Sequence, residues 1–288
     1  MSARLRAIAR ETVTIVQTGR YRSPGGRDVT LAGSIAAAVT GTRMYTPDDP
    51  VDVPAGNGAD PVIEVTNQTS LQAARRLGGT AACLVFASAK NPGGGFRTGA
   101  QAQEESIARA SALHACLESV PEFYAFHRQQ RDLRYSDRVI YSPAVPVFRD
   151  DKGILLDEPY RVSFLTAAAP NLGAIRRNQP ADAGTVPDVL AARAGRVLRV
   201  AAAHGHRVLL LGAWGCGVFG NDPAVAAAAA FAGQIARRGA GSTGSCFPST
   251  TVTPARPRTP RSPAFSPRTR PSADYPGPGG SAGAAAGP

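Results

Sequence analysis

The sequence predicts a three-layer α/β/α domain followed by a disordered tail. Between residues 60 and 240, short apolar or β-branched runs alternate with segments of helical length and periodicity. The apolar runs are nearly continuous, as expected of strands that are covered by helices on both faces. After residue 239 the composition changes abruptly to Pro, Arg, Ala and Gly without strand or helix periodicity.

The elements follow one another in a regular order. Apolar residues at helical spacing predict an amphipathic helix within Met1 to Gly19, rather than a transit peptide. The predicted strands are Pro61 to Asn67, Ala81 to Ser88, Arg138 to Phe148, Tyr160 to Ala167 and His206 to Gly212. The predicted helices are Ser70 to Leu77, Gln103 to Leu117, Asp188 to Ala203 and Asp222 to Arg237. The last begins well, because Asn221 can cap it and Pro223 suits its first turn.

Composition excludes several classes of protein. With 288 residues and 43% apolar content, the chain can bury a sizeable core. The longest uncharged apolar run, Ala224 to Ala232, is about half of what a membrane span needs. The formal charge of +11 comes almost entirely from arginine, since only Lys90 and Lys152 are lysines. Together with abundant Ala, Gly and Pro, this is typical of GC-rich coding sequence, so the charge does not by itself predict sequence-specific nucleic-acid binding.

Cysteine and histidine usage predicts neither disulfides nor a metal. None of the four cysteines forms a CxxC pair, which favours a reducing, cytoplasmic setting. The four histidines lack zinc-ligand spacing, so no metal or cofactor is expected.

The most informative segment follows the strand that ends near Ser88. Asn91 leads into three consecutive glycines, Gly93, Gly94 and Gly95, and a helix then opens with Gln103, Glu104 and Glu105. Glycines here allow positive φ and close approach of backbone N–H groups to a ligand. Adjacent helical residues point about 100° apart, so one glutamate can face the glycine loop while the other supports it.

A second glycine loop follows the last predicted strand and precedes a helix. It contains Gly215, Cys216, Gly217, Val218, Phe219 and Gly220. Such a loop forms an anion site, and two of them at the carboxyl ends of strands in one sheet predict a crevice for a diphosphate. Neither loop matches the GK[ST] or GxGxxG phosphate-binding patterns.

The triple glycine, the seven residues that follow it and QEE together resemble the signature of the microbial-type poly(ADP-ribose) glycohydrolases. The stretches VTNQTSLQAARRL, APNLG and GAWGCGVFGND also resemble that family, and the similarity covers about residues 5 to 238. The resemblance implies a macrodomain with a mixed central sheet over residues 1–239, including a helical amino-terminal extension to about residue 58.

The resemblance also implies an activity, namely hydrolysis of the ribose–ribose O-glycosidic bond of poly(ADP-ribose). Glu105 would protonate the leaving oxygen, Glu104 would hold ribose hydroxyls, and the substrate's own diphosphate would help to position water. A glutamate that acts as an acid near neutral pH needs a pKa raised by burial. The expected partners are poly(ADP-ribose) or ADP-ribosylated protein, with ADP-ribose as product and no membrane.

The resemblance further implies ligand-binding roles around these glutamates. Asn91 would contact the distal ribose, the glycine loop would close over it, and Gln103 would line the site. Phe219 would shield that sugar, or else anchor its loop as a core residue. Asn67 and Asn171 would line the pocket or cap turns, and Cys216 is expected to fit a tight loop rather than to act as a nucleophile.

Two alternative functions stay open at this point. The first is a non-catalytic ADP-ribose-binding module, against which the intact QEE counts. The second is a hydrolase of mono-ADP-ribose on protein or nucleic acid. The tail at 240–288 also departs from the family, which is expected to continue with one more apolar strand. The amino-acid sequence of the tail resembles GC-rich coding sequence read out of frame, which suggests a frameshifted carboxyl end. Loss of the family's last strand would expose a sheet edge.

Overall fold

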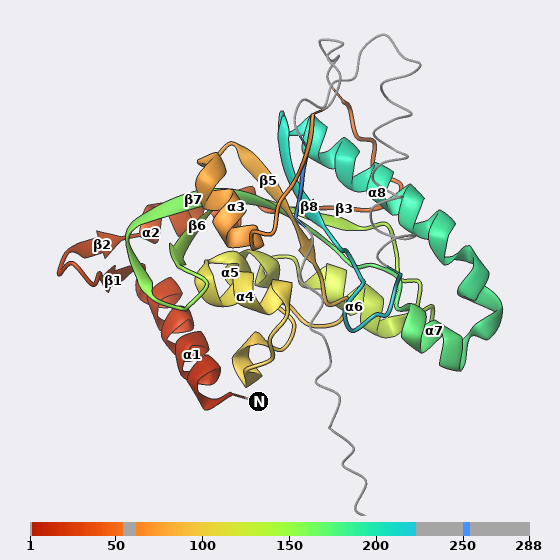
Figure 1. Ribbon diagram of the computed structural model, residues 1–288, viewed down its shortest axis with the longest axis horizontal. Coiled ribbons are helices and arrows are strands. Elements are labelled where there is room, and N and C mark those ends of the chain that lie inside the picture. Colours follow the sequence, from red (N-terminus) through yellow and green to blue (C-terminus); the bar gives the residue numbers. More distant parts are fainter. Residues whose placement is uncertain (1, 54–61, 223–249, 254–288) are drawn as a thin grey trace, which may run out of the picture. The chain divides into compact units, whose positions relative to one another are not determined.

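The computed structural model describes residues 2–53, 62–222 and 250–253 (Figure 1). The predicted helix Asp222 to Arg237, except for its first residue, and most of the tail at 240–288 lie outside these described residues. Within them, the structure confirms the predicted α/β class.

A mixed seven-stranded sheet has the order β3-β6-β7-β5-β8-β9-β4. The pairs β3·β6 and β6·β7 are antiparallel, whereas the pairs β7·β5, β5·β8, β8·β9 and β9·β4 are parallel. The strands are β3 (Arg43–Tyr45), β4 (Ile63–Val65), β5 (Ala81–Phe86), β6 (Val139–Arg149), β7 (Leu155–Ala167), β8 (Val208–Gly212) and β9 (Thr250–Thr253).

Helices pack against both faces of this sheet. Central strand β5 divides its side chains accordingly: Cys83 and Val85 join one apolar cluster, and Ala82 and Leu84 join the other. The helices are α1 (Ala3–Thr18), α2 (Ala32–Gly41), α3 (Ser70–Leu77), α4 (Gln103–Ala110), α5 (Leu113–Glu118), α6 (Pro121–Gln129), α7 (Leu172–Asn178) and α8 (Val186–Ala203). Short 3₁₀ turns are η1 (Phe96–Thr98) and η2 (Pro180–Thr185).

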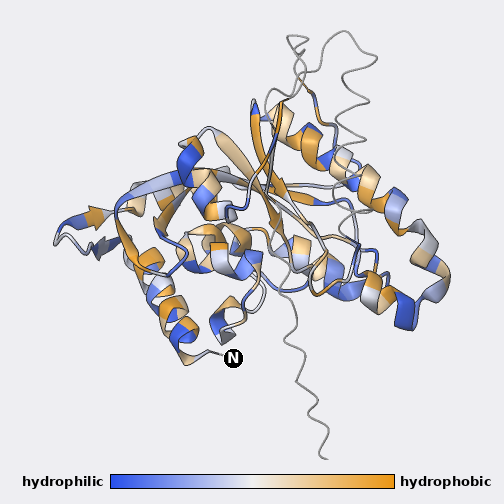
Figure 2. Cartoon of the chain, viewed as in Figure 1, coloured by the Kyte–Doolittle hydropathy of each residue, from blue (hydrophilic) through white to orange (hydrophobic). Residues whose placement is uncertain are grey.

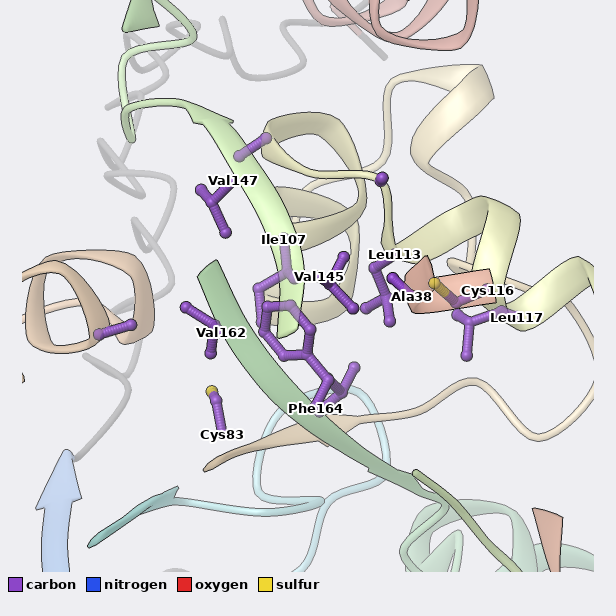
Figure 3. Packing of buried hydrophobic residues seen from close by; sticks show 14 of the residues in the cluster. Ala38, Cys83, Ile107, Leu113, Cys116, Leu117, Val145, Val147, Val162 and Phe164 are labelled. Atoms are coloured by element: carbon purple, nitrogen blue, oxygen red, sulfur yellow. The ribbon is translucent and has the colours of Figure 1, made fainter. Parts of the chain in front are cut away.

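The two clusters define the outer layers. Helices α2 to α6 contribute to the first, in which Ile107 and Leu113 pack against Val145 and Phe164 of the sheet (Figure 3). Helices α7 and α8 contribute to the second, around Leu190 and the strands' opposite face. The surfaces are mixed in hydropathy, with polar and apolar residues alternating along each helix (Figure 2). The arrangement is the predicted α/β/α sandwich.

The predicted helix Gln103 to Leu117 is divided into α4 and α5. Ser111 is the reason, because its backbone is extended and bridges Val147. Its hydroxyl donates to the carbonyl of Ile107 at 2.7 Å and accepts from the N–H of Leu113 at 3.2 Å. A serine that binds neighbouring backbone groups in this way competes with helix continuation.

The amino-terminal segment is not wholly helical, contrary to the expected extension. A hairpin of β1 (Arg20–Arg22) and β2 (Asp28–Thr30) separates α1 from α2. Strand β3 then forms an edge of the main sheet. These strands are three residues each, too short to show alternation in the sequence.

The tail differs from the expectation that it has no strand. Residues Thr250–Thr253 form β9, which lies between β8 and β4 in the sheet. The sequence TTVT consists of β-branched residues, which favour strands. The sequence suggested that loss of a carboxyl-terminal strand would expose a sheet edge, but β8 is paired with β9. No helix of the described residues is long and apolar enough to cross a membrane.

Candidate active site

A cavity of about 210 Å³ lies where β5 and β8 end. The two strands are parallel neighbours, so the loops that follow them meet at one edge of the sheet. The cavity walls are Phe86, Ala87, Ser88, Ala102, Gln103, Glu104, Glu105, Ala169, Ala213, Trp214, Gly215, Gly217, Val218 and Phe219. The second glycine loop and both glutamates therefore border one space, together with Ser88 and Ala102, which lie before and after the first glycine loop. Gly93, Gly94 and Gly95 do not line the cavity.

Glu104 is the buried member of the glutamate pair, with 2% of its surface exposed. Its Oε2 accepts a hydrogen bond from the N–H of Ser88 at 2.6 Å. Its Oε1 is buried without a hydrogen-bond partner among the described residues. Burial, with a smaller contribution from the charge of Glu105, raises the pKa of Glu104 well above its usual range.

Glu105 is only partly buried and faces the glycine loop. Its Oε1 accepts a hydrogen bond from the N–H of Gly95 at 3.0 Å. The neighbouring Gly94 leaves no room for a side chain, because a Cβ there would lie 3.1 Å from Glu104 Oε2 and closer still to Glu105 Oε1. Gly94 also has φ +58°, a conformation that suits glycine.

The glycine loop therefore differs from the expected ligand cradle. The N–H of Gly94 donates to the carbonyl of Asn91, and that of Gly95 donates to Glu105. A Cβ at Gly93 would meet Phe96 at 3.1 Å and His114 at 3.2 Å. Gly93, Gly94 and Gly95 thus pack against the carboxylates and the residues beneath them, and they fix both glutamates in place.

Gln103 is the first residue of α4, and its side chain joins that helix to the end of β5 by hydrogen bonds. Its Oε1 accepts from the N–H of Phe86 at 2.9 Å, and its Nε2 donates to the carbonyl of Leu84 at 2.7 Å. Nε2 also lies 3.2 Å from the hydroxyl of Ser70, at the start of α3. Although Gln103 borders the cavity, its amide group is engaged by the protein and sets the position of the glutamates that follow.

The second loop contains backbone donors that are not used within the described part of the chain. Among the described residues, the N–H groups of Gly217, Val218 and Phe219 make no hydrogen bond, and all three residues line the cavity. Successive N–H groups without protein partners are a common feature of anion sites. The loop's shape depends on Gly215 and Gly220, which have φ of +77° and +68°.

The side chain of Asn221 holds that loop in place by hydrogen bonds. Its Nδ2 donates to the carbonyls of Pro170 at 2.9 Å and Gly215 at 3.1 Å. Phe219 packs partly against the second apolar cluster, as expected of a loop anchor, and also borders the cavity, so the predicted role of shielding a sugar stays a prediction. Val218 is 91% exposed at the tip of the loop.

The remaining predicted site residues lie away from the cavity wall. Asn171 caps α7, since its Oδ1 accepts from the N–H of Ala174 at 3.0 Å. Asn91 and Asn67 are exposed, in the glycine loop and after β4. Cys216 packs against the second cluster, and burial raises the pKa of its thiol to about 11, which disfavours a thiolate nucleophile.

Several residues of the site were not singled out from the sequence. Ser88 holds Glu104 through its backbone, a role that no side-chain pattern reveals. Trp214 is fully buried and donates from Nε1 to the carbonyl of Ala167 at 3.0 Å. Tyr135, at φ +61°, has its ring centroid 6.0 Å from that of Phe219. A non-glycine residue in this strained conformation often marks a functional site, but only the structure reveals it.

Comparison with known proteins places these features in context. The family described as "Microbial-type PARG, catalytic domain" matches residues 9–150. The chain is 49% identical to the poly(ADP-ribose) glycohydrolase of Thermomonospora curvata bound to the inhibitor ADP-HPD, over 90% of this chain and 96% of that one, with a TM-score of 0.76. It is 42% identical to the Deinococcus radiodurans enzyme in complex with ADP-ribose, over 78% and 92% of the chains, with a TM-score of 0.69. No curated protein sequence matches the chain.

Proposed function

The chain belongs to the microbial-type poly(ADP-ribose) glycohydrolases, and on that premise we propose that Glu105 is the general acid that cleaves the ribose–ribose bond of the polymer. The observation that carries the proposal is the position of Glu105. It is the glutamate that is only partly buried at the cavity wall, and the N–H of Gly95 fixes its Oε1.

Cleavage of this bond requires one proton at the leaving oxygen. In the proposed step, Glu105 donates that proton, the bond between the anomeric carbon and the oxygen breaks, and an oxocarbenium-like ribose forms. A water molecule adds to the anomeric carbon and releases its proton to the resulting carboxylate. The products are ADP-ribose and a polymer that is shorter by one unit, with the enzyme returned to its starting state.

Glu104 supports this step through its unpartnered oxygen. Its Oε2 is already held by Ser88, whereas the buried Oε1 has no partner among the described residues and provides an acceptor for a ribose hydroxyl. Burial raises the pKa of Glu104 well above its usual range, so this carboxyl keeps its proton to higher pH than an ordinary carboxyl does.

The second loop supplies the complement for the substrate's diphosphate. Gly217, Val218 and Phe219 line the same cavity as Glu105, and their N–H groups make no hydrogen bond among the described residues, so they are available to a diphosphate. A diphosphate held there lies near the developing positive charge and can position the attacking water. The ADP-ribose and ADP-HPD complexes of the Deinococcus and Thermomonospora enzymes support this choice of ligand.

Release of ADP-ribose from automodified poly(ADP-ribose) tests the proposal, with wild type compared with Glu105→Gln and Glu104→Gln. We expect wild type to release ADP-ribose and Glu105→Gln to retain binding while its rate falls by about 10²–10⁴-fold. A folded wild type that binds the polymer without releasing ADP-ribose would instead indicate a binding module. Release only from mono-ADP-ribosylated protein would indicate the other alternative substrate.

A further inference from the structure

A second cavity, of about 110 Å³, lies between α1, α4 and the turn that joins β6 to β7. Its cationic lining residues are Arg4, Arg109, Arg149 and Lys152. Two acids, Asp150 and Asp151, also line it. The carboxylate of Asp150 is occupied by the turn itself, because its Oδ1 accepts from the N–H groups of Lys152 at 2.9 Å and Ile154 at 2.8 Å. Positive charge therefore exceeds negative charge in the cavity.

Arg109 carries a buried charge without a neutralising partner. Only 6% of its surface is exposed, and no carboxylate of the described residues lies within ion-pair distance. Its guanidinium donates to the carbonyl of Ala100 at 2.6 Å and lies 3.5 Å from the hydroxyl of Ser106. Burial lowers the pKa of Arg109 and the charge of Glu105 offsets this only in part, as expected of a cation that lacks a counterion in direct contact. An anion in the adjoining cavity would supply that counterion.

The other three cationic residues of the cavity differ in the ion pairs and hydrogen bonds that they make. Arg149 is structural, since it is paired with Glu11 at 2.8 Å and donates to Thr12 and Gly153. Arg4 and Lys152 are exposed, and Arg4 bonds only the carbonyl of Lys152, at 2.5 Å. Their charged ends thus remain available for an incoming anion.

This cavity is closely connected to Glu105. Arg109 lies one helical turn after Glu105 on α4, about 6 Å along the helix axis. A short chain of hydrogen bonds also joins them: Arg109 donates to Ala100, the N–H of Ala100 donates to Gly95 at 3.1 Å, and the N–H of Gly95 donates to Glu105. Gln101 borders this second cavity and the next residue, Ala102, borders the first, so neighbouring residues just before α4 line the two cavities.

We propose that this cationic cavity binds the diphosphate of the polymer unit that departs from Glu105. This inference rests on the proposed function. In the polymer, the leaving oxygen belongs to the ribose of the neighbouring unit, and that unit carries its own diphosphate. With the released unit's diphosphate on the loop at 215–220, the neighbouring diphosphate needs a separate cationic site near the acid. The cavity beside α4 has the charge and the position for it.

The test compares two substrates with one double variant. Arg4→Glu/Lys152→Glu reverses both exposed charges without touching the catalytic residues. Arg207→Glu is the matched control, because Arg207 is exposed and immediately precedes β8, at the opposite edge of the sheet from the active-site cavity. The substrates are long poly(ADP-ribose) and an ADP-ribosyl glycoside with a neutral aryl leaving group, which has no second diphosphate.

We expect the double variant to lose about tenfold in kcat/KM on the polymer, equivalent to 1.4 kcal/mol, and to retain wild-type kcat/KM on the aryl glycoside. Its polymer kcat/KM should also depend less steeply on salt than that of wild type, while Arg207→Glu should match wild type in both respects. Thermal unfolding establishes that both variants are folded.

Three other results overturn parts of the account and are distinguishable. Unchanged polymer kinetics, or an equal loss on both substrates, refutes the site for the departing unit. Unchanged polymer kinetics in the double variant, combined with an effect of inorganic pyrophosphate on the aryl glycoside rate that is present in wild type and absent in the double variant, assigns the cavity to a free anion and refutes the polymer source. A wild type that cleaves neither substrate refutes the proposed function itself.

Discussion

Replacing Gly94 by alanine tests whether the glycine loop exists to let the backbone approach the two carboxylates. The substitution has two separable costs. An L-residue at φ +58° is disfavoured by about 1–2 kcal/mol wherever it occurs. In addition, the new Cβ would lie 3.1 Å from Glu104 Oε2 and closer to Glu105 Oε1, so Glu105 must move. Because a displacement of about 1 Å in a catalytic group can cost about 10²-fold in rate, we expect Gly94→Ala to lose about that factor in kcat/KM.

Gly205→Ala provides the matched control. Gly205 has φ +72°, but nothing lies within 4 Å of a Cβ placed there. Gly205→Ala therefore has the same backbone cost as Gly94→Ala, but its new Cβ makes no contact with the active site. Gly205→Ala should lower the free energy of unfolding by about 1–2 kcal/mol in denaturant titrations, and Gly94→Ala should lower it by more, because its Cβ also contacts both glutamates.

Initial rates of ADP-ribose release, measured over a range of polymer concentrations, separate the two effects. Gly205→Ala should retain wild-type kcat/KM, and Gly94→Ala should not. Equal kcat/KM for the two variants would show that Gly94 is needed only for its backbone conformation, and the argument from close approach would fail.

Three further predictions follow from other contacts. Gln103→Leu removes the hydrogen bonds that the Gln103 side chain makes with the N–H of Phe86 and the carbonyl of Leu84, so it should lower the free energy of unfolding by about 2–4 kcal/mol. Because these bonds position the glutamates that follow, it should also reduce kcat more than it changes KM. A change in KM alone would indicate that Gln103 binds the ligand instead. Asn171→Ala removes the cap of α7 and should cost about 1 kcal/mol in a denaturant titration while kcat/KM is unchanged; a loss of kcat/KM would restore its ligand role. Burial raises the pKa of Glu104 above its ordinary 4.5, so the folded chain retains a proton that the unfolded chain releases, and the free energy of unfolding falls as pH rises from 4.5 through the raised pKa. Glu104→Gln should therefore gain stability relative to wild type across that rise in pH. A stability difference that does not depend on pH would contradict the argument.

The sequence is most informative where local chemistry decides the structure. The predicted helix Ser70 to Leu77 is found with the same bounds, because the capping box of Thr69 and Gln72 and the left-handed Gly78 define its ends. The predicted β5 extends to Phe86, and α4 begins at Gln103 as expected. Strands covered on both faces and glycines at their ends are visible as patterns in the chain. The expected crevice between two glycine loops is found only in part, because Gly93, Gly94 and Gly95 do not line the cavity.

What could not be predicted depends on contacts between distant residues. Whether a glycine N–H points to a ligand or to Glu105 is decided by the path of the loop, which composition does not encode. Gln103 and Asn171 appeared suited to a ligand, yet their amides serve Leu84 and Ala174. Strand β9 is stabilised by pairing with β8 and β4, so its sequence alone gave no periodic signal.

The most direct test of the central proposal is the dependence of Glu105→Gln on the leaving group. An aryl glycoside of ADP-ribose with an acidic phenol departs without protonation, whereas the ribose oxygen of the polymer needs a proton. If Glu105 is the acid, Glu105→Gln should lose about 10²–10⁴-fold on the polymer and much less on the aryl glycoside. An equal loss on both substrates, or no loss on the polymer, would contradict the assignment.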